Sequence, residues 1–122
     1  MGIRTSGIIA VVDIFNKGAP GTDTDILQNI GGFSARLTPR AGVGVFRIVV
    51  TVGIATSVFK VTEQDSTGTV THLMNSNVVL GVDQVNTFIF PYRNSRTYEF
   101  QVSGATSTIL KLQIEEIDGG VL

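Results

Sequence analysis

The 122-residue sequence contains no cysteine and no tryptophan, and few of its residues are charged. Without cysteine the chain has no disulfide bonds and no thiolate metal sites, which excludes a small secreted scaffold held by disulfides. Charged residues make up 16% of the chain, whereas an ordinary soluble domain has about 25%. The surface is therefore covered largely by threonine, serine, asparagine, glutamine and glycine, or partly by another chain.

A basic excess is also missing, because the formal net charge is −1. Proteins that bind nucleic acid neutralise phosphates with lysine and arginine and normally carry such an excess. We therefore expect no nucleic-acid partner. A net charge this close to zero gives little repulsion between copies of the chain, which favours association.

The N-terminal apolar run is short. A membrane-spanning helix needs about 20 apolar residues, whereas the run of residues 7–12 ends at Asp13. The same interruption, with no small-residue cleavage site after it, argues against a signal peptide. We expect a buried strand here, no membrane contact, and synthesis in the cytoplasm.

Residues 42–118 contain short runs in which apolar and polar side chains alternate, with turn residues between them. This period of two is typical of strands. Residues 45–52 place Phe46, Ile48, Val50 and Val52 on one face. A hairpin is predicted where Asp65-Ser66-Thr67-Gly68 joins residues 57–64 to 69–74. Further strands are predicted at residues 78–82, 85–92, 97–102 and 108–117, the last with Leu110, Leu112 and Ile114 on one face.

This spacing predicts an all-β protein, a jelly-roll-like β-sandwich of about seven or eight short antiparallel strands. An immunoglobulin-like sandwich is the open alternative for its topology. We assign the core to residues 42–118, an extended N-terminal arm with short strands to residues 1–41, and a tail to residues 119–122. Within the arm we predict strands at residues 7–15 and 33–37, and a short helical turn at 22–30 capped by Thr22 or Asp23.

The polar residues that could carry chemistry each have a structural interpretation. His72 is the only histidine. The sequence has no Gly-x-Ser-x-Gly elbow to supply a nucleophile beside it. One histidine without cysteine also cannot make the usual zinc ligand set. Asp23 and Asp25 suit a helix cap better than a weak calcium site, because the other ligands of a calcium loop are missing. The acidic residues Glu115, Glu116 and Asp118 are predicted to form a solvated edge or an interface contact. We therefore predict no catalytic, cofactor or metal site, and a protein that is not an enzyme.

Aromatic and arginine residues gather around one predicted turn, as Tyr92, Arg93, Arg96 and Tyr98. Such residues are enriched at protein–protein hot spots. They could equally be core or strand-edge tyrosines beside solvated arginines. A third interpretation is that Tyr92 and Tyr98 form a platform on which a sugar stacks. The absence of tryptophan disfavours it.

From residue 45 to residue 117, after a glycine-rich arm, the chain runs through a strand, a hairpin and three alternating segments. These segments are Phe88-Ile89-Phe90, Tyr98-Glu99-Phe100-Gln101-Val102 and Leu110-Lys111-Leu112-Gln113-Ile114-Glu115-Glu116-Ile117. The pattern resembles the small cement or decoration proteins of tailed bacteriophage heads. The resemblance implies a jelly-roll or β-tulip fold, a homotrimer, and binding to the major capsid protein on the exterior of the virion.

We expect a structural protein that binds copies of itself and a capsid lattice, bridging neighbouring capsid subunits. The predicted contact residues are Ile8, Ile9, Val11 and Val12 in the arm and Tyr92, Arg93 and Arg96 at the turn. The alternative function is a carbohydrate-binding or adhesion module, also built on a β-sandwich.

Overall fold

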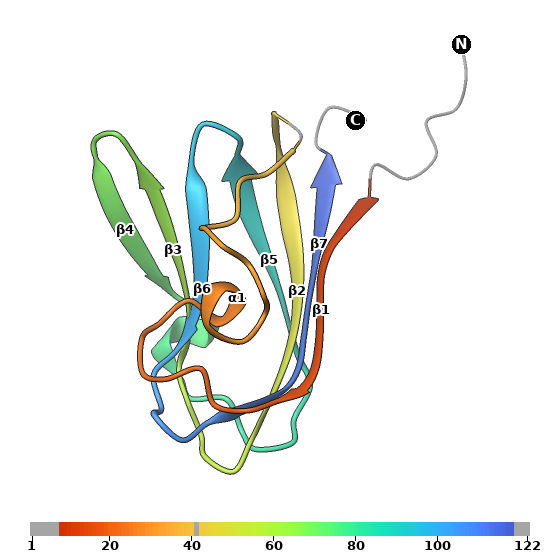
Figure 1. The fold of residues 1–122 in the computed structure, drawn as a ribbon, viewed down its shortest axis with the longest axis vertical. Coiled ribbons are helices and arrows are strands. Elements are labelled where there is room, and N and C mark those ends of the chain that lie inside the picture. The colour runs from red at the N-terminus through yellow and green to blue at the C-terminus, as the bar shows by residue number, and fades with distance from the viewer. Residues whose placement is uncertain (1–7, 41, 119–122) are drawn as a thin grey trace.

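The computed structural model describes residues 8–40 and 42–118 (Figure 1). The described residues form seven strands: β1 (Ile8–Lys17), β2 (Val43–Gly53), β3 (Phe59–Asp65), β4 (Gly68–Leu73), β5 (Asn86–Arg93), β6 (Thr97–Val102) and β7 (Thr108–Asp118). They also form the short helix α1 (Ile26–Asn29) and the 3-10 turn η1 (Asn75–Asn77). The predicted tail at residues 119–122 and the first seven residues of the predicted arm lie outside the described residues.

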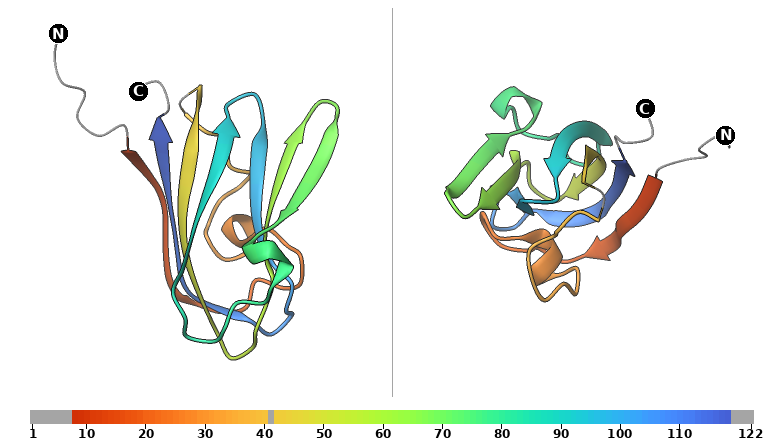
Figure 2. Two further views of the ribbon diagram at one scale, coloured as in Figure 1. Left: turned by 180° about the vertical axis from the view of Figure 1, so that it is seen from behind. Right: turned by 90° about the horizontal axis from the view of Figure 1, so that it is seen from above.

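The strands form two antiparallel sheets that face each other, with strand orders β1-β7-β2-β5 and β4-β3-β6 (Figures 1 and 2). The chain passes repeatedly from one sheet to the other, so sequence neighbours such as β2 and β3 lie in different layers. The predicted all-β fold, a β-sandwich of antiparallel strands, is therefore confirmed. Because every strand pairs antiparallel, the two sheets can keep one face on the core and one toward solvent.

The predicted alternation on β2 is confirmed: Phe46, Ile48, Val50 and Val52 are all fully buried. Phe46 lies at the centre of an aromatic cluster, with ring centroids 4.8 Å from Tyr92, 5.1 Å from Tyr98 and 5.7 Å from Phe100. Rings at these separations pack in the tilted and edge-to-face geometries that aromatic pairs prefer. The cluster joins the two sheets, because Phe46 and Tyr92 come from one and Tyr98 and Phe100 from the other.

The prediction for β7 is wrong at one position. Ile109 is buried in place of Leu110, while Leu112 and Ile114 are buried as predicted. The register between β2 and β7 shifts there, because Thr51 lies opposite Lys111 but Val52 lies opposite Ile109. Such a bulge places an extra residue in one strand and changes the face to which the following side chains point.

The described part of the predicted arm belongs to the sandwich. β1 is an edge strand of the larger sheet and pairs with β7, the last of the described strands. The predicted helical turn is shorter than residues 22–30, and its N-cap is Asp25, not Thr22 or Asp23. The strand predicted at residues 33–37 is reduced to a single bridge between Leu37 and Tyr98.

The sandwich has two distinct ends. The turn end holds residues 42–43, the β3–β4 turn at residues 66–67 and the β5–β6 turn at residues 94–96, at the top of Figure 1. The loop end holds residues 54–58, 78–85 and 103–107, at the bottom of Figure 1. Within the described ranges, no helix has the length and apolar character needed to cross a membrane.

Candidate functional site

The aromatic and arginine cluster predicted from the sequence does come together at the turn end, but both tyrosines point inward. Tyr92 is 2% exposed and Tyr98 is 0% exposed. The Tyr98 hydroxyl oxygen accepts a hydrogen bond from the Arg93 N–H at 2.9 Å, and the Tyr92 hydroxyl donates to the Ile117 carbonyl at 3.3 Å. This burial corrects the predictions that Tyr92 contacts a partner and that the two rings form a sugar platform, because almost none of either ring is accessible.

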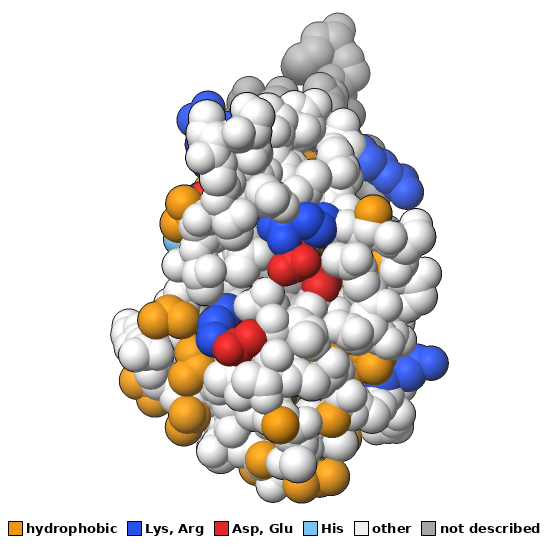
Figure 3. Space-filling model, turned by 60° about the vertical axis from the view of Figure 1, so that its left-hand side comes forward, with side chains coloured by type: hydrophobic (Ala, Val, Ile, Leu, Met, Phe, Trp, Pro, Cys, Tyr) orange, Lys and Arg blue, Asp and Glu red, His pale blue; other side chains and the backbone are white. Residues whose placement is uncertain are grey.

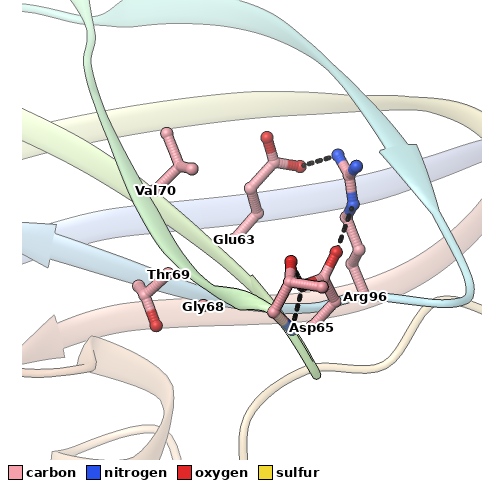
Figure 4. A pocket seen from close by; sticks show the side chains of 7 residues that line it. Glu63, Asp65, Gly68, Thr69, Val70 and Arg96 are labelled. Atoms are coloured by element: carbon pink, nitrogen blue, oxygen red, sulfur yellow. Dashed lines mark hydrogen bonds and ion pairs between the residues drawn. The ribbon is translucent and has the colours of Figure 1, made fainter.

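The charged side chains of the turn end bind one another (Figure 4). Arg96 lies between two carboxylates, 3.1 Å from Glu63 Oε2 and 3.5 Å from Asp65 Oδ2. The other Glu63 oxygen lies 2.8 Å from Nε2 of His72. Arg93, by contrast, is exposed. The network joins β3, β4 and the β5–β6 turn, so the predicted contact residue Arg96 already has partners within its own chain.

His72 and Glu63 line a groove of about 410 Å³ whose wall also includes Phe90 and Arg93. The His72 ring packs edge-on against Phe90, with centroids 4.9 Å apart. Burial would raise the pKa of the Glu63 carboxyl, but hydrogen bonds from His72 and Arg96 outweigh it and hold that pKa below its usual 4.5. The ionised Glu63 carboxylate therefore acts as a structural link between β3, His72 on β4 and Arg96 at the β5–β6 turn.

Glu116 is buried at the turn end, which corrects the prediction of a solvated acidic edge at this position. Its two carboxylate oxygens accept hydrogen bonds from the Arg40 N–H at 3.1 and 2.9 Å. The Tyr92 hydroxyl lies 3.5 Å from Glu116 Oε2. Burial, together with the negative charges of Glu116 and Asp118, raises the pKa of Tyr92 to about 12. The neighbouring Glu115 follows the prediction more closely, because its side chain reaches outward to pair with Arg47.

The two aspartates weighed as calcium ligands have structural partners. Asp25 is buried and caps α1, accepting hydrogen bonds from the Leu27 N–H at 3.3 Å and the Phe100 N–H at 3.2 Å. Burial raises the pKa of Asp25 above its usual 3.8, although its hydrogen bonds oppose the shift. Asp23 pairs with Lys60 at 2.5 Å. Within residues 8–40 and 42–118, no group of three or more histidine and acidic side chains could hold a metal ion.

The predicted contact residues of the arm lie on β1. Val12 is buried in the core of its own chain, which leaves it no surface for a partner. The side chains of Ile8, Ile9 and Val11 lie outside the described part of the structure. The backbones of Ile8 and Ile9 pair with β7, opposite Ile117 and Glu116, whereas Val11 lies at the register shift between Ala10 and Val12.

The loop end is apolar and was not predicted as a site. Hydrophobic side chains gather at the lower end of the molecule, and most charged side chains in this view lie above them (Figure 3). Ile54 is 75% exposed and Val85 is 70% exposed. The other large apolar side chains exposed at this end are Val78, Val79 and Val82. Among residues 54–58, 78–85 and 103–107, Asp83 is the one charged residue.

Main-chain hydrogen bonds hold these loops together. The Leu80 N–H donates to the Ser57 carbonyl at 2.6 Å, and the Asp83 N–H donates to the Val52 carbonyl at 2.8 Å. The strand predicted at residues 78–82 is thus reduced to single bridges at Leu80 and Val82. Leu80 is buried while Val78, Val79 and Val82 face solvent, so the segment fixes a set of valines on the outside.

Ile54 has an unusual backbone conformation, with φ of 68°. A hydrogen bond of 2.8 Å from the Ala55 N–H to the Gly53 carbonyl closes a γ-turn around it. A γ-turn with positive φ at its centre is rare and strained, and a β-branched residue in that region is an outlier. Strain of this kind costs about 1–3 kcal/mol and clusters at functional sites.

A scan against protein-family models finds no match to this chain, and a search of curated proteins finds no significant relative.

Proposed function

We propose that the protein is a structural component of a protein shell, a capsid cement that binds neighbouring capsid subunits through its loop end. The observation that carries this proposal is the apolar, nearly charge-free surface of that end. Large exposed apolar patches are rare on monomers and mark interaction sites. The core of a protein–protein interface is depleted in charged residues, which is the composition of residues 54–58, 78–85 and 103–107.

The strain at Ile54 supports the same surface. Glycine or asparagine would adopt a φ of 68° at lower cost than isoleucine does. The strained backbone at Ile54 therefore lowers folding stability, although the side chain is exposed and does not pack into the core. A contact between Ile54 and a partner would account for this residue type at the tip of the β2–β3 loop.

The strand order supports the shell more generally. Eight-stranded jelly rolls are common in viral capsid proteins. In that topology the first and last strands are neighbours in one sheet, as β1 and β7 are here. An eight-stranded jelly roll has one more strand between β1 and β2, which pairs with β6. In this chain the Leu37–Tyr98 bridge occupies that position. On this proposal the protein lies on the exterior of a virion. The homotrimer expected from the sequence is a separate prediction, which the mass in solution tests.

The carbohydrate-binding alternative loses its physical basis, because it required Tyr92 and Tyr98 to expose their rings. Both rings are buried in the aromatic cluster around Phe46. The proposal therefore rests on protein–protein contact alone.

The test begins with virus particles purified from the source culture by density gradient, in which quantitative mass spectrometry counts the chain. We expect copy numbers comparable to those of the capsid subunits. Particles stripped of the chain are then incubated with recombinant protein. Wild-type protein should rebind, whereas a Val82→Ser, Val85→Ser variant should rebind at least about tenfold more weakly, because polar side chains replace apolar contact area.

Ile89→Ser is the matched control, because Ile89 is also an exposed apolar residue but lies on the outer face of β5. It should rebind as the wild type does. Absence of the chain from particles, or equal rebinding of the loop-end variant, would overturn the proposal.

A further inference from the structure

β4 is exposed on both of its faces. Val70 is 55% exposed, and His72 is the one residue of the strand that is half-buried. β4 is the outer strand of the smaller sheet and pairs with β3 alone among the described strands. In Figures 1 and 2 the β3–β4 hairpin leans away from the larger sheet toward the turn end. Both faces of β4, and its edge on the side away from β3, are therefore accessible.

The hydrogen-bonding direction of β4 follows from its register. Gly68 lies opposite Asp65 across a two-residue turn, and the Met74 N–H donates to the Phe59 carbonyl at 2.9 Å. Antiparallel pairs alternate between hydrogen-bonded and non-hydrogen-bonded positions, so the even-numbered residues bond to β3. The N–H and C=O groups of Thr69, Thr71 and Leu73 accordingly point away from β3, along the open edge.

The outer edge of β6 is closed by the chain itself. Leu37 and Tyr98 exchange main-chain hydrogen bonds of 3.1 and 2.9 Å. Further along the strand, the Phe100 N–H donates to Asp25 Oδ1 at 3.2 Å, and the Val102 carbonyl accepts from the Asp23 N–H at 2.9 Å. No further strand can pair where these groups are already bonded.

The two edges of the larger sheet carry features that discourage pairing. β1 has a register shift between Ala10 and Val12 and the exposed charge of Asp13. β5 contains Pro91, which has no N–H, and the exposed charge of Arg93. Bulges, prolines and charges are the usual protections of an edge strand. Within the described strands, β4 alone has no shift in its register, no proline and no Lys, Arg, Asp or Glu.

We propose that β4 pairs antiparallel with β4 of a second copy of this chain, across a two-fold axis at Thr71. With the axis there, Thr71 faces Thr71 of the other copy and Thr69 faces Leu73. All three residues with free main-chain groups are then bonded, and the two three-stranded sheets become one. A two-fold contact needs a self-complementary surface, and β4 meets this condition because it places no like charges opposite each other.

This contact is independent of the proposed shell function, since it uses β4 and not the loop end. It predicts a dimer, or an even-numbered assembly, in place of the homotrimer expected from the sequence. Both surfaces can be occupied at once, because β4 leans toward the turn end and the apolar loops lie at the opposite end. Failure of one proposal therefore leaves the other standing.

The absence of cysteine makes cross-linking decisive. Thr71→Cys, Val70→Cys and His72→Cys are oxidised as single variants of the full chain and analysed on non-reducing gels. Facing residues in a hydrogen-bonded antiparallel pair have Cα atoms about 5.5 Å apart, within the range of a disulfide. We expect a covalent dimer from Thr71→Cys and little from the other two, which face each other and not themselves. Thr87→Cys on the exposed face of β5 is the control and should stay monomeric.

A second test measures the mass of the unmodified chain and of charge variants by sedimentation equilibrium. Thr71→Lys and Thr71→Glu should each dissociate the dimer, because like charges directly opposite in a sheet repel. Mixing the two variants should restore a dimer of one copy of each. Thr87→Lys should leave the wild-type dimer intact.

Several results would overturn this pairing: a wild-type monomer at high micromolar concentration, a trimer, or a dimer whose mass is unchanged by Thr71→Lys. A monomer would leave the edge to an extended segment of another protein.

Discussion

The two ends of the sandwich differ in whether their side chains have partners within the chain. At the turn end, Arg96 is bound to Glu63 and Asp65, and the carboxylate of Glu116 accepts hydrogen bonds from the Arg40 N–H. At the loop end, apolar side chains such as Ile54 and Val85 are left in solvent. At the turn end, the residue types most typical of an interface therefore stabilise this chain itself, whereas at the loop end the large apolar side chains left exposed are valines and an isoleucine.

The largest expected effect separates the interior of the turn end from the surface of the loop end. Phe46→Ala should lower the free energy of unfolding by about 3–5 kcal/mol, because the ring packs against three other rings and is fully buried. Val85→Ala should change it by no more than about 0.5 kcal/mol. Urea denaturation measures both. Similar losses of unfolding free energy in the two variants would mean that Val85 is packed like Phe46, and the two ends would not differ as described.

The next effect depends on alkaline pH. The Tyr92 pKa of about 12 in the folded protein exceeds the usual 10.0, so the unfolded state loses its proton first. Stability is therefore complete below pH 10 and falls as pH rises from about 10 to 12. This difference between the folded and unfolded pKa of Tyr92 corresponds to a loss of about 2–3 kcal/mol in the free energy of unfolding. Urea denaturation across this range should show the loss.

Tyr92→Phe is the matching variant and should flatten this part of the pH profile. Some slope should persist in it, because burial also raises the pKa of Tyr98. Absorbance at 295 nm reports the titration without interference, since the chain has two tyrosines and no tryptophan. Two tyrosines that titrate near 10 in the folded protein would contradict the buried turn end.

Removing the buried carboxylate of the turn end tests its hydrogen bonds. Glu116→Ala should lower the free energy of unfolding by about 1–3 kcal/mol, because the part-buried Arg40 N–H loses its acceptor. Glu116→Gln keeps one acceptor oxygen and should cost less. The alanine variant should also lower the pKa of Tyr92, since the charge of Glu116 helps to raise it. An unchanged tyrosine titration would contradict the role assigned to Glu116.

Local patterns in the sequence predicted most of the fold. The period of two on β2, β5 and β6 identified the inward faces, because a strand with one buried face must alternate. What local patterns could not show are pairings and shifts that depend on distant partners. The pairing of β1 with β7 joins the first and last of the described strands, and the bulge that buries Ile109 depends on the register with β2.

The candidate site was harder to predict, for a physical reason that Tyr92 makes plain. Its alternation with Phe90 already placed it on the buried face, yet its residue type suggested a contact surface. The loop end was not predicted because residues 78–82 have the composition of a short strand. The available signal was the two adjacent valines without alternation, between residues that tolerate positive φ at Asn77 and Asp83.

The smallest expected effect concerns Ile54 and should have opposite signs for folding and for binding. Ile54→Gly should raise the free energy of unfolding by about 0.5–1 kcal/mol, because glycine adopts positive φ without strain, although it gains more freedom in the unfolded chain. The same change removes an exposed isoleucine and should weaken rebinding to stripped particles. Asp83→Gly is the control: its φ is 62°, but aspartate tolerates that region, so the gain should be smaller. If the Ile54→Gly variant were less stable than the wild type and still bound stripped particles fully, the isoleucine would stabilise the fold and not contact a partner. The loop end would then not differ from the turn end in its role.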